Sequence, residues 1–311
     1  MQPKVTVIII TYNQEDYIGE AIESALSQRY QNKEIVVCDD FSTDATADII
    51  RAYANKYPSL VIPQIGDSNI GITGNCNRGF SAATGDFICF LGGDDYFLDG
   101  KIEAQVNYML DSPEKALSYH DVYLFDDNSN KDVGLYSDRH GKKDGGIKEL
   151  LVEGCFFCAT SVMIRKEFAP VNGFDPRIAR ASDWLFWCQT VINSQEPESA
   201  VGYCDGVFAK YRRHSGNITN VVDAKALEEA LLSLTIIEET DSALRNLVRY
   251  CKSKRLLTYS AKYLLNKKWR QAFSAMKEAL NLSSFRIFGV FSYIAISYGR
   301  AQLTKRFRNL K

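Results

Sequence analysis

Short apolar runs alternate with helical stretches through the first 91 residues of the chain. The runs have the length of strands and are rich in branched and aromatic residues, whereas the stretches between them place apolar residues three and four apart. This alternation predicts an α/β fold, with a mostly parallel central sheet and crossover helices on its faces. The expected strands are 4–13, 34–40, 60–64 and 87–91, and the expected helices are 17–27, 47–57 and one that ends near residue 84.

Pairs of acidic residues follow two of these expected strands. Asp39 and Asp40 end one run, and Asp94 and Asp95 follow another. Because the carboxyl ends of parallel strands meet at one edge of a sheet, both pairs should lie where open α/β folds bind ligands. Adjacent carboxylates repel each other, and Mg²⁺ or Mn²⁺ together with a substrate phosphate would offset that repulsion. Two solvated turns are the alternative interpretation.

Charge is distributed unevenly along the chain, although its net value is only −1. From Asp241 onward there are sixteen Lys and Arg but two Asp and Glu, with apolar residues at helical spacing. This contrast predicts a catalytic domain over 1–222 and a basic amphipathic helical region over 223–311. Such helices are typical of proteins that contact an anionic membrane, here through 241–311. A helical cap on the first domain or an oligomer interface is the alternative, and no pattern typical of nucleic-acid binding is present.

The cysteines and the hydropathy of the chain predict its compartment. The eight Cys lack the regular spacing of a disulfide framework, and Cys155 and Cys158 form a single CxxC pair without a second pair or a nearby His. No signal peptide precedes the first apolar run, and no apolar stretch is long enough to span a bilayer. The expectation is a cytoplasmic protein with reduced thiols, which basic helices would hold at the inner face of the cell membrane.

Six motifs follow one another in the first two thirds of the chain. They are Val-Ile-Ile-Ile-Thr-Tyr-Asn (7–13), Glu-Ile-Val-Val-Cys-Asp-Asp-Phe-Ser-Thr-Asp (34–44), Asn69-x-Gly71, Asn77-x-Gly79, Gly-Asp-Phe-Ile (85–88) and Asp94-Asp95. In this order they resemble the inverting glycosyltransferases of family 2, over about residues 3–220. The resemblance implies the GT-A fold, with a nucleotide-sugar half over about 1–100 and an acceptor half over about 101–222. It also implies a divalent cofactor, Mn²⁺ or Mg²⁺.

The resemblance assigns the nucleotide pocket to residues after the first, second and fourth expected strands. Thr11 and Tyr12 should line it, Asp39 should shape it, and Asp94 should contact the ribose or the outer shell of the metal. Asp40 should accept a hydrogen bond from N3–H of a pyrimidine. Because an ionised carboxylate accepts but cannot donate, Asp40 favours uracil or thymine over cytosine.

The metal and the phosphates have their own candidate residues. In the acid motif, Asp95 is the candidate for direct metal contact. The segment Lys210–Thr219 resembles the family's Tyr-Arg-x-His element, so His214 is a candidate ligand of the metal or the diphosphate. A surface histidine without a role is the alternative. Arg212 and Arg213 are candidates for neutralising phosphate charge.

The general base and one departure from the family pattern complete the set of candidate residues. Asp183 matches the second acid of the family's paired acids and is the candidate general base, while Ser182 stands in place of the first. The alternative is that Asp183 is a helix N-cap. Many family members carry an Arg just before the Asn of the Asn77-x-Gly79 motif, where this chain has Cys76. Arg78 follows that Asn and is a candidate donor ligand in its place.

The expected activity is transfer of a sugar from a UDP- or dTDP-sugar to a saccharide or lipid-linked acceptor. Synthesis of a bacterial surface polysaccharide or a lipid-linked oligosaccharide is the expected context. A nucleotidyltransferase is one alternative, but it would need a Gly-rich basic loop after the first strand, which residues 11–15 lack. A non-catalytic scaffold that binds sugar nucleotides is another, and it predicts binding without turnover.

The second half of the predicted catalytic domain carries weaker local patterns. A helix is expected over 101–110, and strands over 116–119 and 122–125. Residues 126–146 are polar and rich in Gly, Asp and Asn, which predicts a flexible loop near the acceptor side. The favoured alternative is a solvated loop without a functional role. The apolar segment 154–165 predicts one further strand, and a helix is expected to open near residue 182.

Overall fold

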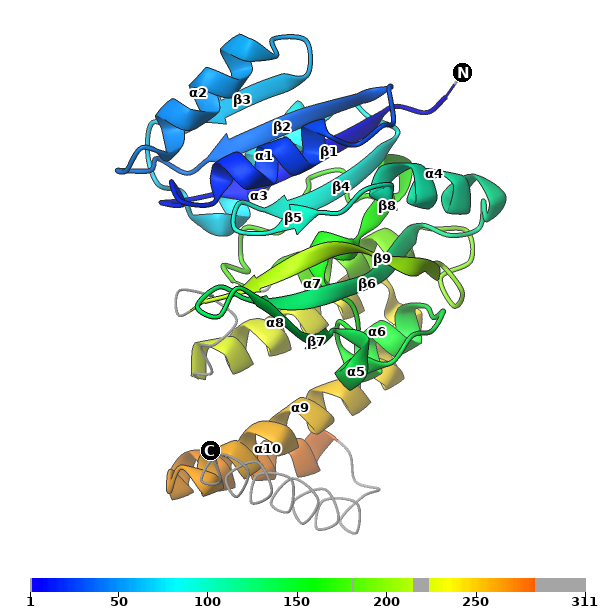
Figure 1. Ribbon diagram of the computed structural model, residues 1–311. Coiled ribbons are helices and arrows are strands. Elements are labelled where there is room, and N and C mark those ends of the chain that lie inside the picture. Colours follow the sequence, from blue (N-terminus) through cyan, green and yellow to red (C-terminus); the bar gives the residue numbers. More distant parts are fainter. Residues whose placement is uncertain (1, 181, 215–223, 283–311) are drawn as a thin grey trace. The chain divides into compact units, whose positions relative to one another are not determined.

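The computed structural model describes residues 2–180, 182–214 and 224–282, which belong to two compact units, Met1–Val221 and Val222–Lys311 (Figure 1). The first unit combines a β-sheet with helices, and the described part of the second is helical. The predicted α/β class and the predicted helices after residue 223 are therefore confirmed.

Parallel strands form the first half of the sheet. At its centre, β1 (Val5–Thr11) pairs with β2 (Lys33–Asp39) on one side and with β4 (Phe87–Gly92) on the other. On the outer side, β2 pairs with β3 (Val61–Ile65). Apart from a half-buried residue in each, β1, β2 and β4 are buried along their length, as expected for strands covered on both faces.

Strand directions are mixed in the second half of the sheet. Its strands are β5 (Tyr96–Phe97), β6 (Leu117–Asp126), β7 (Lys131–Leu135), β8 (Met163–Arg165) and β9 (Val201–Arg213). β6 and β9 are parallel, whereas β8 runs antiparallel to both β4 and β6. Within the described residues the sheet has nine strands in the order β3-β2-β1-β4-β8-β6-β9-β5, with β7 paired to β6.

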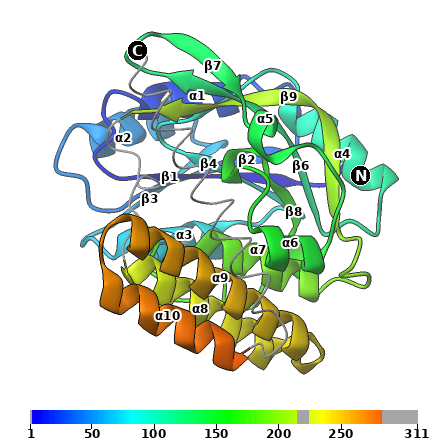
Figure 2. The ribbon, with the colours of Figure 1, turned by 90° about the horizontal axis from the view of Figure 1, so that it is seen from below.

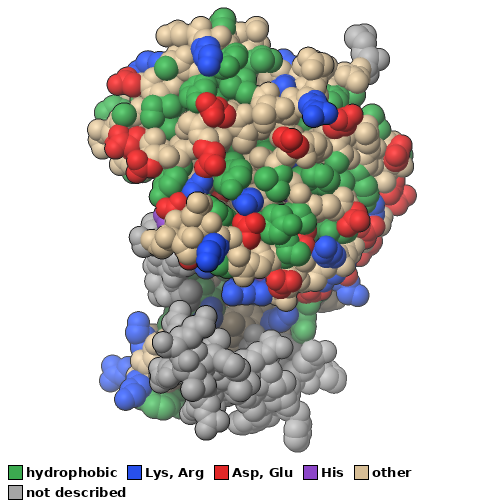
Figure 3. Space-filling view, viewed as in Figure 1, with side chains coloured by type: hydrophobic (Ala, Val, Ile, Leu, Met, Phe, Trp, Pro, Cys, Tyr) green, Lys and Arg blue, Asp and Glu red, His purple; other side chains and the backbone are tan. Residues whose placement is uncertain are grey.

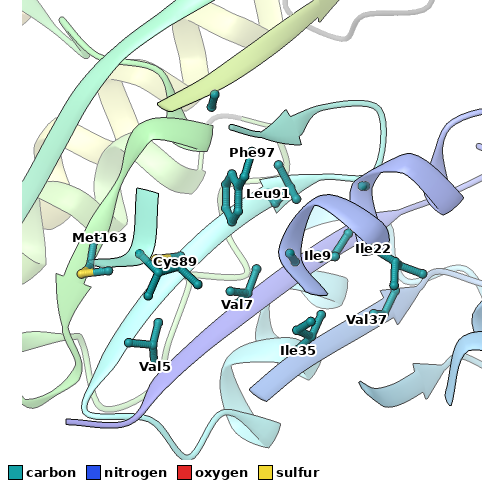
Figure 4. Close-up of a cluster of buried hydrophobic side chains, with 14 of the residues drawn as sticks. Val5, Val7, Ile9, Ile22, Ile35, Val37, Cys89, Leu91, Phe97 and Met163 are labelled. Atoms are coloured by element: carbon teal, nitrogen blue, oxygen red, sulfur yellow. The ribbon is translucent and has the colours of Figure 1, made fainter. Parts of the chain in front are cut away.

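Helices cover both faces of the parallel half (Figure 2). α1 (Ile18–Leu26) packs on the face formed by alternate residues of β1 and β2, where Ile9, Ile22 and Val37 belong to one buried cluster (Figure 4). α3 (Gly71–Ala82) packs on the opposite face at close range. A Cβ at Gly79 would lie only 2.5 Å from the Ile8 side chain, so glycine permits this approach.

The remaining helices and turns of the first unit connect or flank these strands. They are α2 (Thr46–Lys56), α4 (Lys101–Asp111), α5 (Ser137–His140), α6 (Ile147–Glu153), η1 (Ala159–Ser161), η2 (Lys166–Phe168) and α7 (Ser182–Ile192). On the face shown in Figure 3, acidic and basic side chains of this unit are interspersed with apolar ones.

Three segments of the second half differ from the sequence predictions. Residues 126–146 include β7 and α5, because the polar residues of β7 form an exposed edge hairpin with β6. Only the last three residues of 154–165 form a strand, and a 3₁₀ turn precedes them. The thirteen-residue β9 was not predicted, since Gly206 at φ +128° and a register shift against β6 break its two-residue period.

The described part of the second unit consists of α8 (Ala224–Thr240), η4 (Ser242–Leu244), α9 (Arg245–Leu265) and α10 (Trp269–Leu282). Its core contains Leu227, Leu256, Ala275 and Ala279, and Lys267 at φ +59° forms the turn between α9 and α10. None of the helices in the described ranges has the length and hydropathy to cross a bilayer. The predicted apolar and basic segment 285–308 lies outside the described residues.

Candidate active site

The ends of three neighbouring parallel strands carry most of the predicted site residues. The register pairs Thr11 of β1 with Asp39 of β2, and Ile10 of β1 with Gly92 of β4. The turn that bears Asp94 and Asp95 therefore begins at the same edge of the sheet as the turn that bears Asp39 and Asp40. The prediction that both acid pairs lie at one edge is confirmed.

Asp39 and Asp40 have different local partners. Asp39 is fully buried, and its carboxylate accepts hydrogen bonds from the backbone N–H (3.0 Å) and the hydroxyl of Ser42. Asp40 accepts from the N–H groups of Ile70 (3.0 Å) and Gly71 (2.8 Å), which begin α3. Asp39 thus holds its own turn, and Asp40 satisfies two donors at a helix N-terminus.

The loop after β1 lies directly against this turn. The carbonyl of Thr11 accepts from the N–H of Asp40 (3.1 Å), and the Thr11 hydroxyl donates to Gln14 (2.8 Å). Tyr12, in the loop after β1, is 46% exposed, and Phe41, in the turn after β2, is 48% exposed. Two exposed aromatic side chains are therefore attached to the loops beside the Asp40 carboxylate.

Arg78 lies on α3 beside the Asp39–Asp40 turn. Its guanidinium donates to the Asp39 carbonyl (3.0 Å) and to the Asn75 side chain (2.6 Å), and it is 3.9 Å from the Asp40 carboxylate. Arg78 therefore supports the residues at the end of β2. Arg78 thus lies at the edge of the sheet where the sequence predicts that the sugar nucleotide binds.

The second acid pair combines a buried Asp95 with a half-buried Asp94 and is joined to the end of β9. Asp95 is 4% exposed, and its carboxylate accepts from the backbone N–H of Arg212 (2.9 Å) and from the hydroxyl of Thr160. Burial, and then the neighbouring Asp94 carboxylate, raise the pKa of Asp95 well above its usual range. His214 lies 2.9 Å from Asp94 through Nε2. Asp94, Asp95 and His214 are thus one group of neighbouring side chains.

The two arginines before His214 differ in their surroundings. Each of the three guanidinium nitrogens of Arg212 donates to a protein oxygen: those of Asp94, Asp127 and Glu20. Arg213 is half-buried and makes no ion pair with the described residues. Residues 215–219 of the predicted motif lie outside the described ranges.

Asp183 lies in the first turn of α7. That helix begins at Ser182, so Asp183 is inside it and is not the residue that precedes it, as the N-cap alternative required. Its carboxylate accepts from the N–H of Trp184 (2.8 Å). The side chain is half-buried, and burial raises its pKa from the usual value.

Two thiols show that Asp183 lies near both acid pairs. Burial raises the pKa of the Cys76 thiol, and the carboxylates of Asp183 and Asp40 raise it further. Burial likewise raises the pKa of the Cys158 thiol, together with Asp95 and Asp183. Cys76 is therefore within electrostatic range of both Asp183 and Asp40, and Cys158 of both Asp183 and Asp95. The hydroxyls of Thr73 and Ser182 lie 2.9 Å apart, so α7 begins beside α3, the helix whose N-terminus Asp40 caps.

Several residues that contact this region were not predicted. The acid turn is contacted by Thr160, and Arg212 is contacted by Glu20, Asp127 and Tyr17. Tyr136 lies near Asp183 and both residues of the CxxC pair. Thr160 comes from the segment predicted as a strand. Tyr17 and Glu20 open α1, which sequence periodicity identified only as a buried helix. The sequence around each of these residues gives no indication that its side chain contacts a residue far away in the chain.

The residues of the second acid turn fit a hard divalent cation in part. Carboxylate oxygens suit both Mn²⁺ and Mg²⁺, whereas the imidazole nitrogen of His214 suits Mn²⁺ better than Mg²⁺, and the adjacent carboxylates of Asp94 and Asp95 favour a cation there. Within the described ranges, no group of three or more His, Cys, Asp or Glu residues is arranged as a metal site. A cation at this turn would therefore need ligands beyond these side chains.

The sequence is similar to a known protein family and to curated relatives. The model of the glycosyl transferase family 2 matches residues 6–170. The chain is 31% identical over 216 residues to an uncharacterized protein of Mycobacterium tuberculosis, covering 69% of this chain and 60% of that relative. It is 32% identical over 206 residues to an uncharacterized glycosyltransferase of Haemophilus influenzae, covering 64% of this chain and 79% of that relative. The chain thus spans about 60% of the length of the mycobacterial relative.

Solved structures share the fold at low sequence identity. S. aureus TarS in complex with UDP-GlcNAc superposes with a TM-score of 0.68 at 19% identity, over 90% of this chain and 81% of that one. The mannosyltransferase PcManGT from Pyrobaculum calidifontis, in complex with GDP-Man and Mn²⁺, gives 0.54 at 16% identity, over 100% and 83%. These matches confirm the predicted GT-A architecture of the chain.

Proposed function

Because the chain belongs to the glycosyl transferase family 2, we propose that it transfers a sugar, with inversion, from a nucleotide-diphosphate donor to an acceptor hydroxyl. The observation that carries this proposal is that both acid pairs lie at one edge of the sheet, while α7, which bears Asp183, begins beside α3, the helix that Asp40 caps. Three carboxylates from distant segments supply the three functions that such a transfer needs. These are recognition of the nucleotide, charge compensation at the diphosphate and removal of the acceptor proton.

The donor is proposed to be a UDP- or dTDP-sugar. Thr11, Tyr12 and Phe41 flank Asp40, whose carboxylate can accept N3–H of uracil or thymine in addition to its two backbone donors. Arg78 lies within reach of the same carboxylate and is the proposed donor ligand in place of the family's arginine. TarS binds UDP-GlcNAc in its solved complex, which supports a uridine donor.

The substitution Asp40→Asn tests the proposed base recognition. The introduced amide keeps an acceptor oxygen for α3, but its nitrogen can donate to the unprotonated N3 of cytosine, so the ratio of UDP to CDP affinity should fall. The affinity for UDP alone should fall about 10- to 100-fold, as expected for a lost hydrogen bond to a charged group. Calorimetric titration of both nucleotides measures the ratio. An unchanged ratio in a variant with wild-type thermal stability would remove Asp40 from base recognition.

A divalent cation is proposed to bind at Asp95, with Asp94 and His214 beside it. Divalent cations at phosphate sites are commonly held by one or two carboxylates plus the phosphates of the substrate, which suits a turn without three preassembled ligands among the described residues. When bound, Mn²⁺ or Mg²⁺ would supply positive charge against the diphosphate, which becomes more negative as it leaves. PcManGT is described with Mn²⁺, which supports manganese as the first ion to test.

Asp183 is the proposed general base. Its carboxylate would accept the proton of the acceptor hydroxyl while that oxygen forms a bond to the anomeric carbon of the donor. The bond from the anomeric carbon to the diphosphate oxygen breaks in the same displacement, and the nucleotide diphosphate leaves with the electron pair. A single displacement from the opposite face inverts the anomeric centre. Burial raises the pKa of Asp183 above its usual value, which makes its carboxylate a stronger base.

A donor panel tests the proposed function as a whole. Purified protein with Mn²⁺ or Mg²⁺ should release nucleotide from a UDP- or dTDP-sugar faster than from a GDP-sugar, and faster still with a suitable saccharide or lipid-linked acceptor. Synthesis of a bacterial surface polysaccharide or lipid-linked oligosaccharide is the proposed context, at the cytoplasmic face of the membrane. Binding of a sugar nucleotide without any turnover across the panel would favour a non-catalytic scaffold instead.

The C-terminal unit is proposed to contact an anionic membrane. Trp269, Phe273 and Leu280 of α10 are 57%, 59% and 38% exposed, and their spacing of four and seven places them on one side of the helix. Arg270 and Lys277 lie next to this apolar stripe and are exposed. Lys and Arg side chains also project from the described surface of the unit (Figure 3). An apolar stripe bordered by cations is typical of helices that lie in a membrane interface.

Two sets of substitutions on α10 test the membrane contact. The pair Trp269→Ser and Phe273→Ser should weaken co-sedimentation with phosphatidylglycerol vesicles by at least about tenfold, because two apolar side chains no longer enter the interface. Arg270→Gln should weaken it by about fivefold, whereas Gln271→Ser on the same helix should not. Equal binding of wild type and all variants, or equal binding to neutral and anionic vesicles, would refute the contact. A dimer that the double variant dissociates would identify an oligomer interface.

A further inference from the structure

Arg212 is the buried centre of a network that links four segments of the first unit, although the Glu20 side chain in it is half exposed. Its Nε donates to the Asp94 carbonyl (2.8 Å), Nη1 to Asp127 (2.6 Å) and Nη2 to Glu20. The residue is 6% exposed, and its guanidinium lies over the rings of Tyr17 (4.8 Å) and Phe125 (5.1 Å). Acceptor oxygens and aromatic faces thus enclose the guanidinium.

The charge of Arg212 is compensated within this network. Glu20 and Asp127 both form ion pairs with the single guanidinium, so these three side chains carry one more negative than positive charge. The hydrogen bond from Arg212 also lowers the pKa of Asp127, which keeps that carboxylate ionised. A cation that two carboxylates already neutralise offers little attraction to a diphosphate. The phosphate role predicted for Arg212 therefore does not fit its surroundings.

The same network holds the second acid turn at several points. The backbone N–H of Arg212 donates to the Asp95 carboxylate (2.9 Å), while its side chain holds the carbonyl of the preceding residue, Asp94. The Tyr17 hydroxyl donates to Asp127 (2.9 Å), and the Tyr17 ring lies 5.5 Å from the ring of His214. His214 in turn contacts Asp94. Arg212 is thereby connected to all three proposed neighbours of the metal.

We infer that Arg212 is a positioning residue that orients Asp94, Asp95 and His214 for the cation, and that it does not itself bind the diphosphate. This inference rests on the proposed function of the same site. Consecutive residues of a strand point to opposite faces, so the two arginines at the end of β9 have different surroundings. Arg212 is enclosed by carboxylates and rings, whereas Arg213 forms no ion pair with any described residue.

A conservative variant of Arg212 and a control variant of Arg213 test the positioning role. Arg212→Lys keeps the charge but loses the planar fork that reaches three acceptors. Its affinity for Mn²⁺ in the presence of UDP should fall about 10- to 100-fold, the usual effect of removing a residue that orients metal ligands. Arg213→Met, the matched control that removes the neighbouring charge, should leave the Mn²⁺ affinity unchanged. Electron paramagnetic resonance of free Mn²⁺ measures this affinity without any turnover.

The substitution Asp127→Asn tests the positioning role of Arg212 without altering either arginine. Asp127 contacts Arg212 and Tyr17, so its substitution should reproduce the loss of Mn²⁺ affinity in a protein that still melts cooperatively. The inference would be overturned if Arg212→Lys and Asp127→Asn both kept the wild-type affinity for Mn²⁺ while Arg212→Lys lost affinity for UDP at saturating Mn²⁺. Because the manganese signal needs no donor sugar, a wild-type protein that binds Mn²⁺ with UDP but transfers nothing would refute the proposed function alone.

Discussion

The substitution Asp183→Asn is expected to reduce kcat by about 10²- to 10⁴-fold, the usual contribution of a positioned base, while donor affinity stays within about twofold. Asparagine has nearly the same shape and can still accept the hydrogen bond from the N–H of Trp184, but it cannot take a proton. Transfer kinetics at saturating donor and Mn²⁺ give kcat, and calorimetry gives donor affinity.

The pH profile supplies a second signature of Asp183. Only the deprotonated carboxylate can act as a base, so the rate should rise with pH through its pKa. Because burial raises that pKa, the acid limb should lie above the value of an exposed aspartate. Asp48→Asn on the exposed surface of α2 is the matched control and should change neither kcat nor the profile. A variant at residue 183 with wild-type kcat would remove Asp183 as the base.

Replacing Asp95 by asparagine or alanine is expected to abolish metal-dependent donor binding. The carboxylate is the proposed direct ligand, and losing a negatively charged ligand beside a diphosphate leaves the cation with a neighbouring acid and a histidine. Binding of UDP with and without Mn²⁺ measures the effect as the loss of the Mn²⁺-dependent increment. Transfer activity should fall with it.

Stability separates this effect from misfolding. Asp95→Asn removes the repulsion between the buried Asp95 carboxylate and its neighbour Asp94, so without metal its melting temperature should equal or exceed that of the wild type. The pKa of Asp95 is higher in the folded protein than in the unfolded chain. Asp95 therefore destabilises the folded protein once the pH exceeds the pKa that Asp95 has in the unfolded chain, and the asparagine variant avoids this loss. Asp95→Ala leaves the hydroxyl of Thr160 and the N–H of Arg212 without this acceptor and should lose about 1–3 kcal/mol per group. Mn²⁺-dependent UDP binding by the folded Asp95→Asn protein would contradict the metal role.

Local patterns in the sequence are sufficient to predict the parallel half of the sheet. Each of its central strands is a short apolar run that is buried on both faces, and the following helix has its own apolar period, so β1, β2 and β4 are found close to their predicted positions. The acid pairs follow from the same reasoning, because parallel strands end at one edge. In contrast, β9 has a bulged and irregular pattern, and its pairing with β6 depends on the completed fold.

Long-range contacts limit what the sequence reveals about the site. Arg212 contacts Glu20 and Asp127, which are 192 and 85 residues away, so no local spacing could separate its role from that of Arg213. Asp183 was identified only through the resemblance to a family. Its position beside α3, whose N-terminus Asp40 caps, emerges only from the fold, through the contact between Thr73 and Ser182.

The most direct test of one shared site is a crystal structure of the Asp183→Asn protein with Mn²⁺ and the donor selected by the panel. We expect the pyrimidine N3 within hydrogen-bond distance of Asp40 and the diphosphate with its metal at Asp95. The amide introduced at position 183 should face the anomeric carbon from the side opposite the diphosphate. A nucleotide bound away from Asp40 and Asp95, or an amide at position 183 too far from the anomeric carbon for one hydroxyl to bridge them, would contradict the account.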